Sequence, residues 1–443
     1  MSGRLEWKGG DPARVVIRAA RVVDPRTDLD QVLDVVVEDG LIAAVDTNAG
    51  GREGFDVVEA EGMLLLPAFT DPHVHFRTPG QEHKETLATG TAAAAAGGYC
   101  QVLCMPNTKP VIDSPELLVG LLARAREEAV IPMGQLGAVT VGLAGTELTE
   151  MDSMREAGAF GFTDDGMPIA DAGVMRRALR YQQLAGAVIA LHEEEPTLSM
   201  GASINEGTVS ARLGLRGGSG MSEVSMVLRD CMLAENEGAR IHLQHLSDAR
   251  SVDAVRLAKS RGVLVTAEAS PHHLLLTEEA CESLDTRSKM NPPLRFEQDR
   301  LALIEGLADG TIDCVATDHA PHSPGEKDVP FEEAPFGVTG LETAFAALYD
   351  ELVLRGDFSL ATLVERMTAG CEPFGLPVPK IAVGEPANLT LFDPGRPWSA
   401  GEGGWFSRSS NSCFAGRRFS GRIVMTIAGG VTVHGVDMNG GTR

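Results

Sequence analysis

The stretch Asp71-Pro72-His73-Val74-His75-Phe76-Arg77 stands at the end of an apolar, strand-like run at residues 63–71. His73 and His75 are two residues apart, so on a strand both imidazoles face the same side. That spacing suits chelation of a single metal ion, the alternative being two unrelated surface histidines. The same arrangement, an apolar run followed by polar side chains, recurs along the chain and indicates the fold.

Short apolar runs alternate with Ala-, Leu- and Glu-rich segments of helical composition through the middle of the chain. The eight strand candidates are residues 63–71, 98–106, 135–141, 159–164, 187–191, 240–245, 263–269 and 312–317. Eight repeats of strand then helix predict an α/β protein with a (β/α)₈ TIM-like barrel.

Both ends of the chain are rich in β-branched residues and turn signals. We expect the two ends to meet in a small β-sandwich domain. The predicted division is therefore a barrel at residues 63–379 and a composite β domain made of residues 1–62 and 380–443.

The composition of the chain indicates in which compartment the protein works and which partners it lacks. The 443 residues contain no apolar run of membrane-spanning length, and the first residues lack the apolar segment of a signal peptide. Seven scattered cysteines without a Cys-x-x-Cys pair indicate free thiols in a reducing cytoplasm. A net charge of −24 argues against nucleic acid as a partner. We expect a soluble, cytoplasmic protein with neither a membrane nor a nucleic-acid partner.

Polar side chains lie at the C-terminal ends of five of the predicted strands. Barrel enzymes carry their active sites at these strand ends. These candidates are His73, His75, Asp164, Asp165, His192, His245 and Asp318. Spacing alone does not choose between Asp164 and Asp165. His242 lies three residues before His245, so on a regular strand it faces the other way and is interpreted as a packing residue. Glu193 to Glu195 are interpreted as solvated, the alternative for Glu193 being that it orients a metal ligand.

Imidazole and carboxylate donors without thiolate favour Zn²⁺, with Mn²⁺ or Co²⁺ as substitutes. Two such ions roughly 3.5–4 Å apart would make an activated water available at neutral pH. The convergence of several strand ends therefore predicts a two-metal hydrolytic site.

The chain resembles the amidohydrolase superfamily and, within it, the dihydroorotases of the bacterial long-chain type, over nearly its whole length. The resemblance rests on DPHVHFR at 71–77, MPNT at 105–108, FTDDG at 162–166, LHEE at 191–194, SPHHL at 270–274, MNPPLR at 290–295, TDHAPH at 317–322 and PFGVTGLET at 335–343.

The resemblance implies a role for each site residue, with two Zn²⁺ per subunit. His73 and His75 would bind the first ion, His192 and His245 the second, and Asp165 both. Asp318 would touch the first ion and act as the catalytic base and acid. The implied substrate contacts are Arg77, Asn107, Asn291, His322 and the backbone around Phe336 and Gly337.

The implied reaction is the reversible cyclisation of N-carbamoyl-L-aspartate to L-dihydroorotate and water, in de novo pyrimidine (UMP) biosynthesis. Arg77 offers a two-pronged donor for the carboxylate that does not react, the alternative being a salt bridge at the barrel mouth. The long segment at residues 323–340 is expected to shield the site from water, the alternative being a structural connector.

Two competing functions remain open at this stage. One is another cyclic-amide hydrolase, such as an allantoinase or dihydropyrimidinase. Many such relatives bridge the metals with a carboxylated lysine, and this chain has no lysine between Lys109 and Lys259. The other is a non-catalytic scaffold for aspartate transcarbamoylase, although all six predicted ligands are present. A homodimer is expected, and association with the transcarbamoylase stays open.

Overall fold

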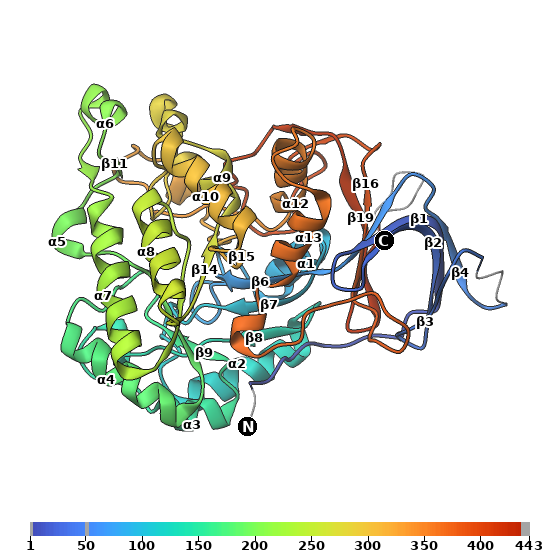
Figure 1. Cartoon of the computed structure of the whole chain (residues 1–443), viewed down its shortest axis with the longest axis horizontal. Helices are drawn as coiled ribbons and strands as arrows, with labels where there is room; N and C mark the ends of the chain where they lie inside the picture. Colours follow the sequence, from blue (N-terminus) through green and yellow to red (C-terminus); the bar gives the residue numbers. More distant parts are fainter. Residues whose placement is uncertain (1–2, 49–52, 436–443) are drawn as a thin grey trace.

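The computed structural model describes residues 3–48 and 53–435. The ends of the predicted composite β domain, residues 1–2 and 436–443, lie outside the described residues, as do residues 49–52. Figure 1 shows helices surrounding a set of strands in one lobe and a curved sheet in the other.

Eight parallel strands alternate with helices in the larger lobe. The strands are β6 (Phe69–Val74), β7 (Tyr99–Cys104), β8 (Met133–Gln135), β9 (Gly161–Thr163), β10 (Val188–Leu191), β13 (Arg240–Leu243), β14 (Leu264–Ala269) and β15 (Cys314–Val315). They are followed in turn by α1 (Leu87–Ala96), α2 (Pro115–Glu128), α3 (Met151–Ala157), α4 (Ala172–Ala185), α7 (Met221–Glu237), α8 (Ala249–Ser260), α10 (Glu297–Asp309) and α13 (Leu360–Thr368). The predicted strand-then-helix repeat is confirmed.

These strands form two hydrogen-bonded sheets, β6-β7-β8 and β9-β10-β13-β14-β15. Single parallel bridges join them: Gly137 to Phe162 links the β8 and β9 sides, and Val74 to His319 links β6 to the segment after β15. The strands therefore follow chain order with their carboxyl ends at one edge. In residues 3–48 and 53–435, no continuous ladder closes the ring.

Several of these helices begin at capping residues that the sequence supplies. Ser114 caps α2 by accepting a hydrogen bond from Leu117 N, and Pro115 occupies the first helical position. Asp171 caps α4 through Val174 N, and Asp248 caps α8 through Arg250 N. These caps fix where the helices leave the strand ends that carry the site.

Strands from both ends of the chain share one eight-stranded sheet. Its members are β1 (Val15–Asp24), β2 (Leu29–Glu38), β3 (Leu41–Asp46), β4 (Asp56–Glu59), β5 (Leu64–Pro67), β16 (Leu389–Asp393), β19 (Arg422–Ala428) and β20 (Val431–Gly435). In Figure 1 the red strands β16 and β19 and the blue strands β1 and β2 stand on opposite sides of this lobe. Strands from the two ends of the chain therefore lie in one sheet, but the predicted two-sheet sandwich is not confirmed, because the ladders give a single curved sheet.

The predicted strand at residues 63–71 is two strands in the structure. β5 pairs with β1 and β16 in the terminal sheet. At the junction Ala68 N donates to Asn388 O, and Phe69 N donates to Gly98 O. The hydrogen-bond partner therefore changes within one apolar run, which sequence periodicity cannot show. Among the described residues, no helix is both long enough and apolar enough to cross a membrane.

Candidate metal centre

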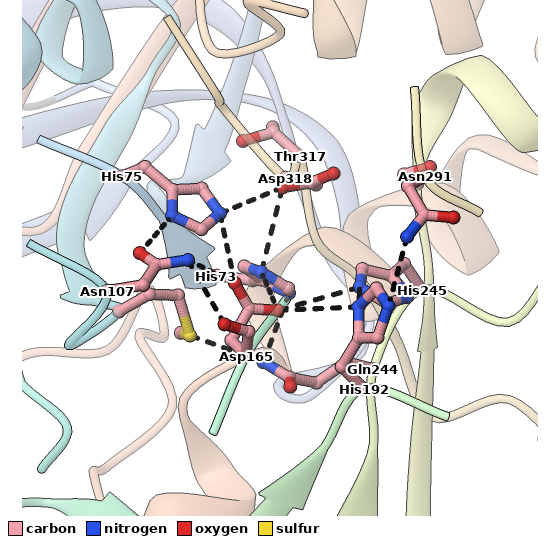
Figure 2. Close-up of polar contacts among 12 residues, drawn as sticks. His73, His75, Asn107, Asp165, His192, Gln244, His245, Asn291, Thr317 and Asp318 are labelled. Atoms are coloured by element: carbon pink, nitrogen blue, oxygen red, sulfur yellow. Dashed lines mark hydrogen bonds and ion pairs between the residues drawn. The ribbon is translucent and has the colours of Figure 1, made fainter. Parts of the chain in front are cut away.

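The six predicted metal ligands meet at the carboxyl edge of the parallel strands (Figure 2). His73 lies in β6 and His75 directly follows it, while the other four follow β9, β10, β13 and β15. All six side chains are buried. They are His73, His75, Asp165, His192, His245 and Asp318.

His73, His75 and Asp165 form the first group of possible ligand atoms. Asp165 Oδ1 lies 3.4 Å from His73 Nε2, and Asp165 Oδ2 lies 3.5 Å from His75 Nε2. Asp318 Oδ1 lies 3.1 Å from His75 Nε2 and 3.6 Å from His73 Nε2. Ligand atoms about 2.1 Å from a tetrahedral ion are about 3.4 Å from one another, so these separations match a shared cation.

Asp165, His192 and His245 form the second group. His192 Nδ1 and His245 Nε2 are each 3.7 Å from Asp165 Oδ1, and 2.9 Å from each other. Asp165 thus belongs to both groups, the position that a bridging carboxylate needs. Although burial opposes it, the surrounding imidazoles hold the pKa of Asp165 well below its usual range, so the carboxylate is ionised.

The neighbouring Asp164 is engaged elsewhere. Its Oδ1 accepts hydrogen bonds from Val139 N at 2.8 Å and Thr140 N at 3.0 Å, and its Oδ2 accepts one from Thr140 Oγ1. Asp164 therefore holds the loop after β8. Of the two adjacent acids, Asp165 is the one that reaches the histidines.

A buried ring nitrogen indicates that the group is built for a cation. Among the described residues, His73 Nε2 has no hydrogen-bond partner. His73 Nδ1 lies 2.7 Å from Glu268 Oε1, an arrangement in which the ring donates from Nδ1 and leaves the Nε2 lone pair facing Asp165. A buried lone pair without a partner is costly, and a bound ion would satisfy it.

Glu268, on β14, was not predicted from sequence. Its Oε1 accepts from His73 and from His245 N at 3.2 Å, and its Oε2 lies 2.9 Å from His242 Nε2. Burial raises the pKa of Glu268 and the two imidazoles lower it, with a net fall to about 2. One ionised carboxylate therefore positions residues of both ligand groups. The one signal in the sequence that could have indicated this role is that Glu268 is an acidic residue inside an otherwise apolar strand.

The backbone is left-handed at three predicted site residues. His245 has φ +31°, Asp318 has φ +46° and Arg77 has φ +55°. Non-glycine residues rarely adopt this conformation, and it clusters at functional sites. His242 contacts Glu268 through its ring Nε2, and His245 contacts it through its backbone N. Interpreting His242 as a mere packing residue missed this link.

A cavity of about 200 Å³ opens above the ligands. Its lining includes every predicted substrate-contact residue: Arg77, Asn107, Asn291, His322, Phe336 and Gly337. Arg77 Nε donates to Pro321 O at 3.2 Å. Within the described part of the chain, no carboxylate lies within ion-pair distance of the Arg77 guanidinium, so the structure does not show the mouth salt bridge considered as its alternative role.

Other cavity residues are tied to the ligands themselves. Asn107 Nδ2 donates to Asp165 Oδ2 at 2.9 Å, and its Oδ1 lies 2.9 Å from His75 Nδ1. Asn291 Nδ2 donates to Glu194 Oε2 at 2.7 Å, and that oxygen lies 3.1 Å from His192 Nε2. Glu194 thus belongs to the site, and its neighbour Glu193 is buried, so neither is the solvated residue that the sequence suggested.

The segment at residues 323–340 packs closely against the barrel. Lys327 Nζ donates to Thr286 O at 3.1 Å, and Lys289 Nζ donates to Phe331 O at 2.8 Å. Gly337 has φ +122°, and a Cβ there would lie 2.7 Å from Ala320 Cβ. Glycine is therefore required where this segment closes on the cavity.

Comparison with known proteins places this site in a family. A family model described as dihydro-orotase-like matches residues 62–251, and one described as the amidohydrolase family matches residues 228–433. Dihydroorotase of Pelotomaculum thermopropionicum is 44% identical, over 95% of this chain and 98% of that protein. Dihydroorotase of Streptomyces coelicolor is also 44% identical, over 94% and 96%.

The chain belongs to the dihydroorotase family. Solved structures of more distant proteins share its fold. L-hydantoinase (dihydropyrimidinase) from Arthrobacter aurescens superposes with a TM-score of 0.85 at 24% identity, covering 97% of each chain. D-hydantoinase (dihydropyrimidinase) from Thermus sp. has a TM-score of 0.79 at 25% identity, covering 94% of each chain.

Proposed function

We propose that this member of the family is an active dihydroorotase, which interconverts N-carbamoyl-L-aspartate and L-dihydroorotate. One observation carries the proposal: two ligand groups that share Asp165 open into a cavity that also presents the guanidinium of Arg77, which has no carboxylate partner among the described residues. A cyclic amide with a carboxylate beside the ring matches that combination.

We propose Zn²⁺ as the metal, with two ions per subunit. His73 and His75 would hold one ion, His192 and His245 the other, with Asp165 between them and Asp318 beside the first. Such ions polarise a carbonyl and make a nucleophilic water available at neutral pH. The imidazole and carboxylate donor set supports this assignment, as does His73 Nε2, which has no hydrogen-bond partner among the described residues.

Asp318 is the proposed proton carrier. Although burial opposes it, the hydrogen bond with His75 and the charge of His73 lower the pKa of Asp318, so it starts as a base. In the hydrolytic direction it accepts the proton of the attacking water and delivers it to the departing ring nitrogen. Arg77 holds the substrate carboxylate, and Asn107 and Asn291 orient the ring from either side.

Metal removal and a substrate panel test this proposal. Stripping the protein with a strong chelator should abolish dihydroorotate hydrolysis, and added Zn²⁺ should restore it. Full activity of the stripped protein would contradict a metal-dependent hydrolase. Preference for allantoin or dihydrouracil would identify another cyclic-amide hydrolase, and inactivity on all three would favour a scaffold.

Arg77 gives a sharper test of substrate choice. Arg77→Gln should raise KM for dihydroorotate by about 30–150-fold, since a charge-assisted hydrogen bond contributes about 2–3 kcal/mol. Dihydrouracil is the same ring without the carboxylate, so its use should change little. Equal losses on both substrates would remove the carboxylate-binding role.

We also propose the pathway, the cellular compartment, the domain division and the assembly of the protein. We place the reaction in cytoplasmic pyrimidine biosynthesis, on a closed (β/α)₈ barrel at residues 63–379 with a β domain from both termini. The eight strands in chain order and the shared terminal sheet support that division, except that β5 (Leu64–Pro67) pairs within the terminal sheet. A homodimer and association with aspartate transcarbamoylase stay predictions, tested by light scattering and by co-purification with that enzyme.

A further inference from the structure

Residues 405–413, here called the mouth strap, come from the C-terminal part of the chain but lie against the barrel mouth. Ser409 Oγ donates to Lys84 O at 2.7 Å, and Arg408 N donates to Glu85 Oε1 at 3.0 Å. Glu85 Oε2 in turn lies 3.2 Å from His319 Nε2, next to Asp318 in the chain. The strap therefore reaches the segment that carries the proposed base.

Asn411, within the mouth strap, joins the two segments that face the substrate cavity. Its Oδ1 accepts a hydrogen bond from His322 N at 3.1 Å. Its Nδ2 donates to Ala320 O at 3.2 Å and to Gly337 O at 3.1 Å. The side chain is only 5% exposed, so these contacts are shielded from water.

The two segments depend on one another for their position. Ala320 N donates to Val338 O at 2.8 Å, and Thr339 N donates to the backbone oxygen of Asn411 at 3.3 Å. His322 Nε2 lies 2.7 Å from Phe336 O. The Asn411 side chain accepts one hydrogen bond and donates two to the backbone of these segments. A primary amide supplies that combination, whereas a carboxylate or an alkyl side chain does not.

We propose that Asn411 is a positioning residue that sets the spacing between His322 and Gly337 and thereby the affinity for substrate. This inference rests on the proposed function, because both positions are assigned there to substrate binding. The hydrogen bonds of the Asn411 side chain go to Ala320, His322 and Gly337, which line the cavity, and not to the six candidate metal ligands. Losing it should weaken binding more than chemistry.

Steady-state kinetics of Asn411→Ala test the proposal. KM for dihydroorotate should rise about tenfold or more while kcat stays within about threefold and zinc content is unchanged. Asn411→Asp keeps the acceptor for His322 N but replaces the donors with an oxygen facing two carbonyls, so it should be equally impaired. Asn388→Ala is the matched control, since Asn388 accepts from Gly429 N in the terminal sheet, away from the cavity.

Amide hydrogen exchange gives a readout that does not depend on catalysis. Peptides covering residues 319–323 and 336–340 should exchange faster in Asn411→Ala and Asn411→Asp than in the parent, while a peptide covering β14 is unchanged. Unchanged KM and exchange in both variants would overturn the proposal, as would parallel loss of kcat and zinc. If the parent protein does not hydrolyse dihydroorotate, the proposed function is wrong. The amide hydrogen exchange rates still decide whether Asn411 orders these segments.

Discussion

At the scale of single residues, Asp318 carries the most direct prediction. Asn at this position keeps an oxygen near His75 but cannot take up a proton at neutral pH. Asp318→Asn should therefore lower kcat by about 10²–10⁴-fold with little change in zinc content. Measuring kcat together with metal content separates loss of the base from loss of the ion. A near-parental kcat would show that another group carries the proton.

Glu268 has a different role, since it contacts the ligands and lies below the cavity. Glu268→Gln removes the charge that holds His73 and His242, and we expect zinc affinity to fall about 10–100-fold. Competition with a chromophoric chelator measures that affinity directly. Glu278→Gln is a suitable control, because Glu278 is also buried but pairs with Asn205, away from the ligands. Equal zinc affinity in parent and Glu268→Gln would contradict the positioning role.

At the scale of elements, the sequence was informative where a side chain follows directly from strand geometry. The carboxyl ends of successive parallel strands meet at one edge, so the sequence alone was enough to place His192 and Asp318 together. Alternation separated His242 from His245, but it could not show that the His242 ring contacts Glu268, because that contact joins two different strands. Asn411 was beyond prediction, since its partner His322 is 89 residues away and no local pattern marks the contact.

The mouth strap also predicts a pH dependence of stability. Glu342 accepts hydrogen bonds from Phe406 N at 3.1 Å and Ser407 N at 3.0 Å. Burial raises the pKa of Glu342 from 4.5 to about 7, against the effect of those two donors. Between these two values the folded state binds more protons than the unfolded state, so this group's contribution to stability falls as pH rises.

Glu342→Gln should remove that part of the pH dependence. The amide keeps an acceptor for the strap and does not titrate, so the difference in Tm between pH 5 and pH 7.5 should be smaller than in the parent. Differential scanning calorimetry at the two pH values checks this. An unchanged Tm difference would mean that Glu342 stays ionised in the folded protein throughout this range.

At the scale of the whole molecule, one hydrophobic cluster extends from the barrel into the terminal sheet, which also has a second cluster of its own. The ring of Phe345 stacks on Phe69 of β6 with centroids 4.8 Å apart, and meets Phe392 of β16 edge-on at 4.9 Å. The fully buried Phe69, Phe345 and Phe392 therefore join the strand that carries His73 to the terminal sheet. Energetic coupling between the lobes follows from this packing.

That coupling predicts how zinc affects unfolding. An ion that binds only the folded state stabilises it by about 4 kcal/mol at a free concentration a thousand times its Kd. Because one hydrophobic cluster spans both lobes, we expect one calorimetric transition that moves upward as a whole when zinc is added to the stripped protein. Phe345→Ala should separate the lobes and leave a lower transition that zinc does not move. Two transitions in the parent, only one of them sensitive to zinc, would show instead that the terminal sheet unfolds independently of the metal centre.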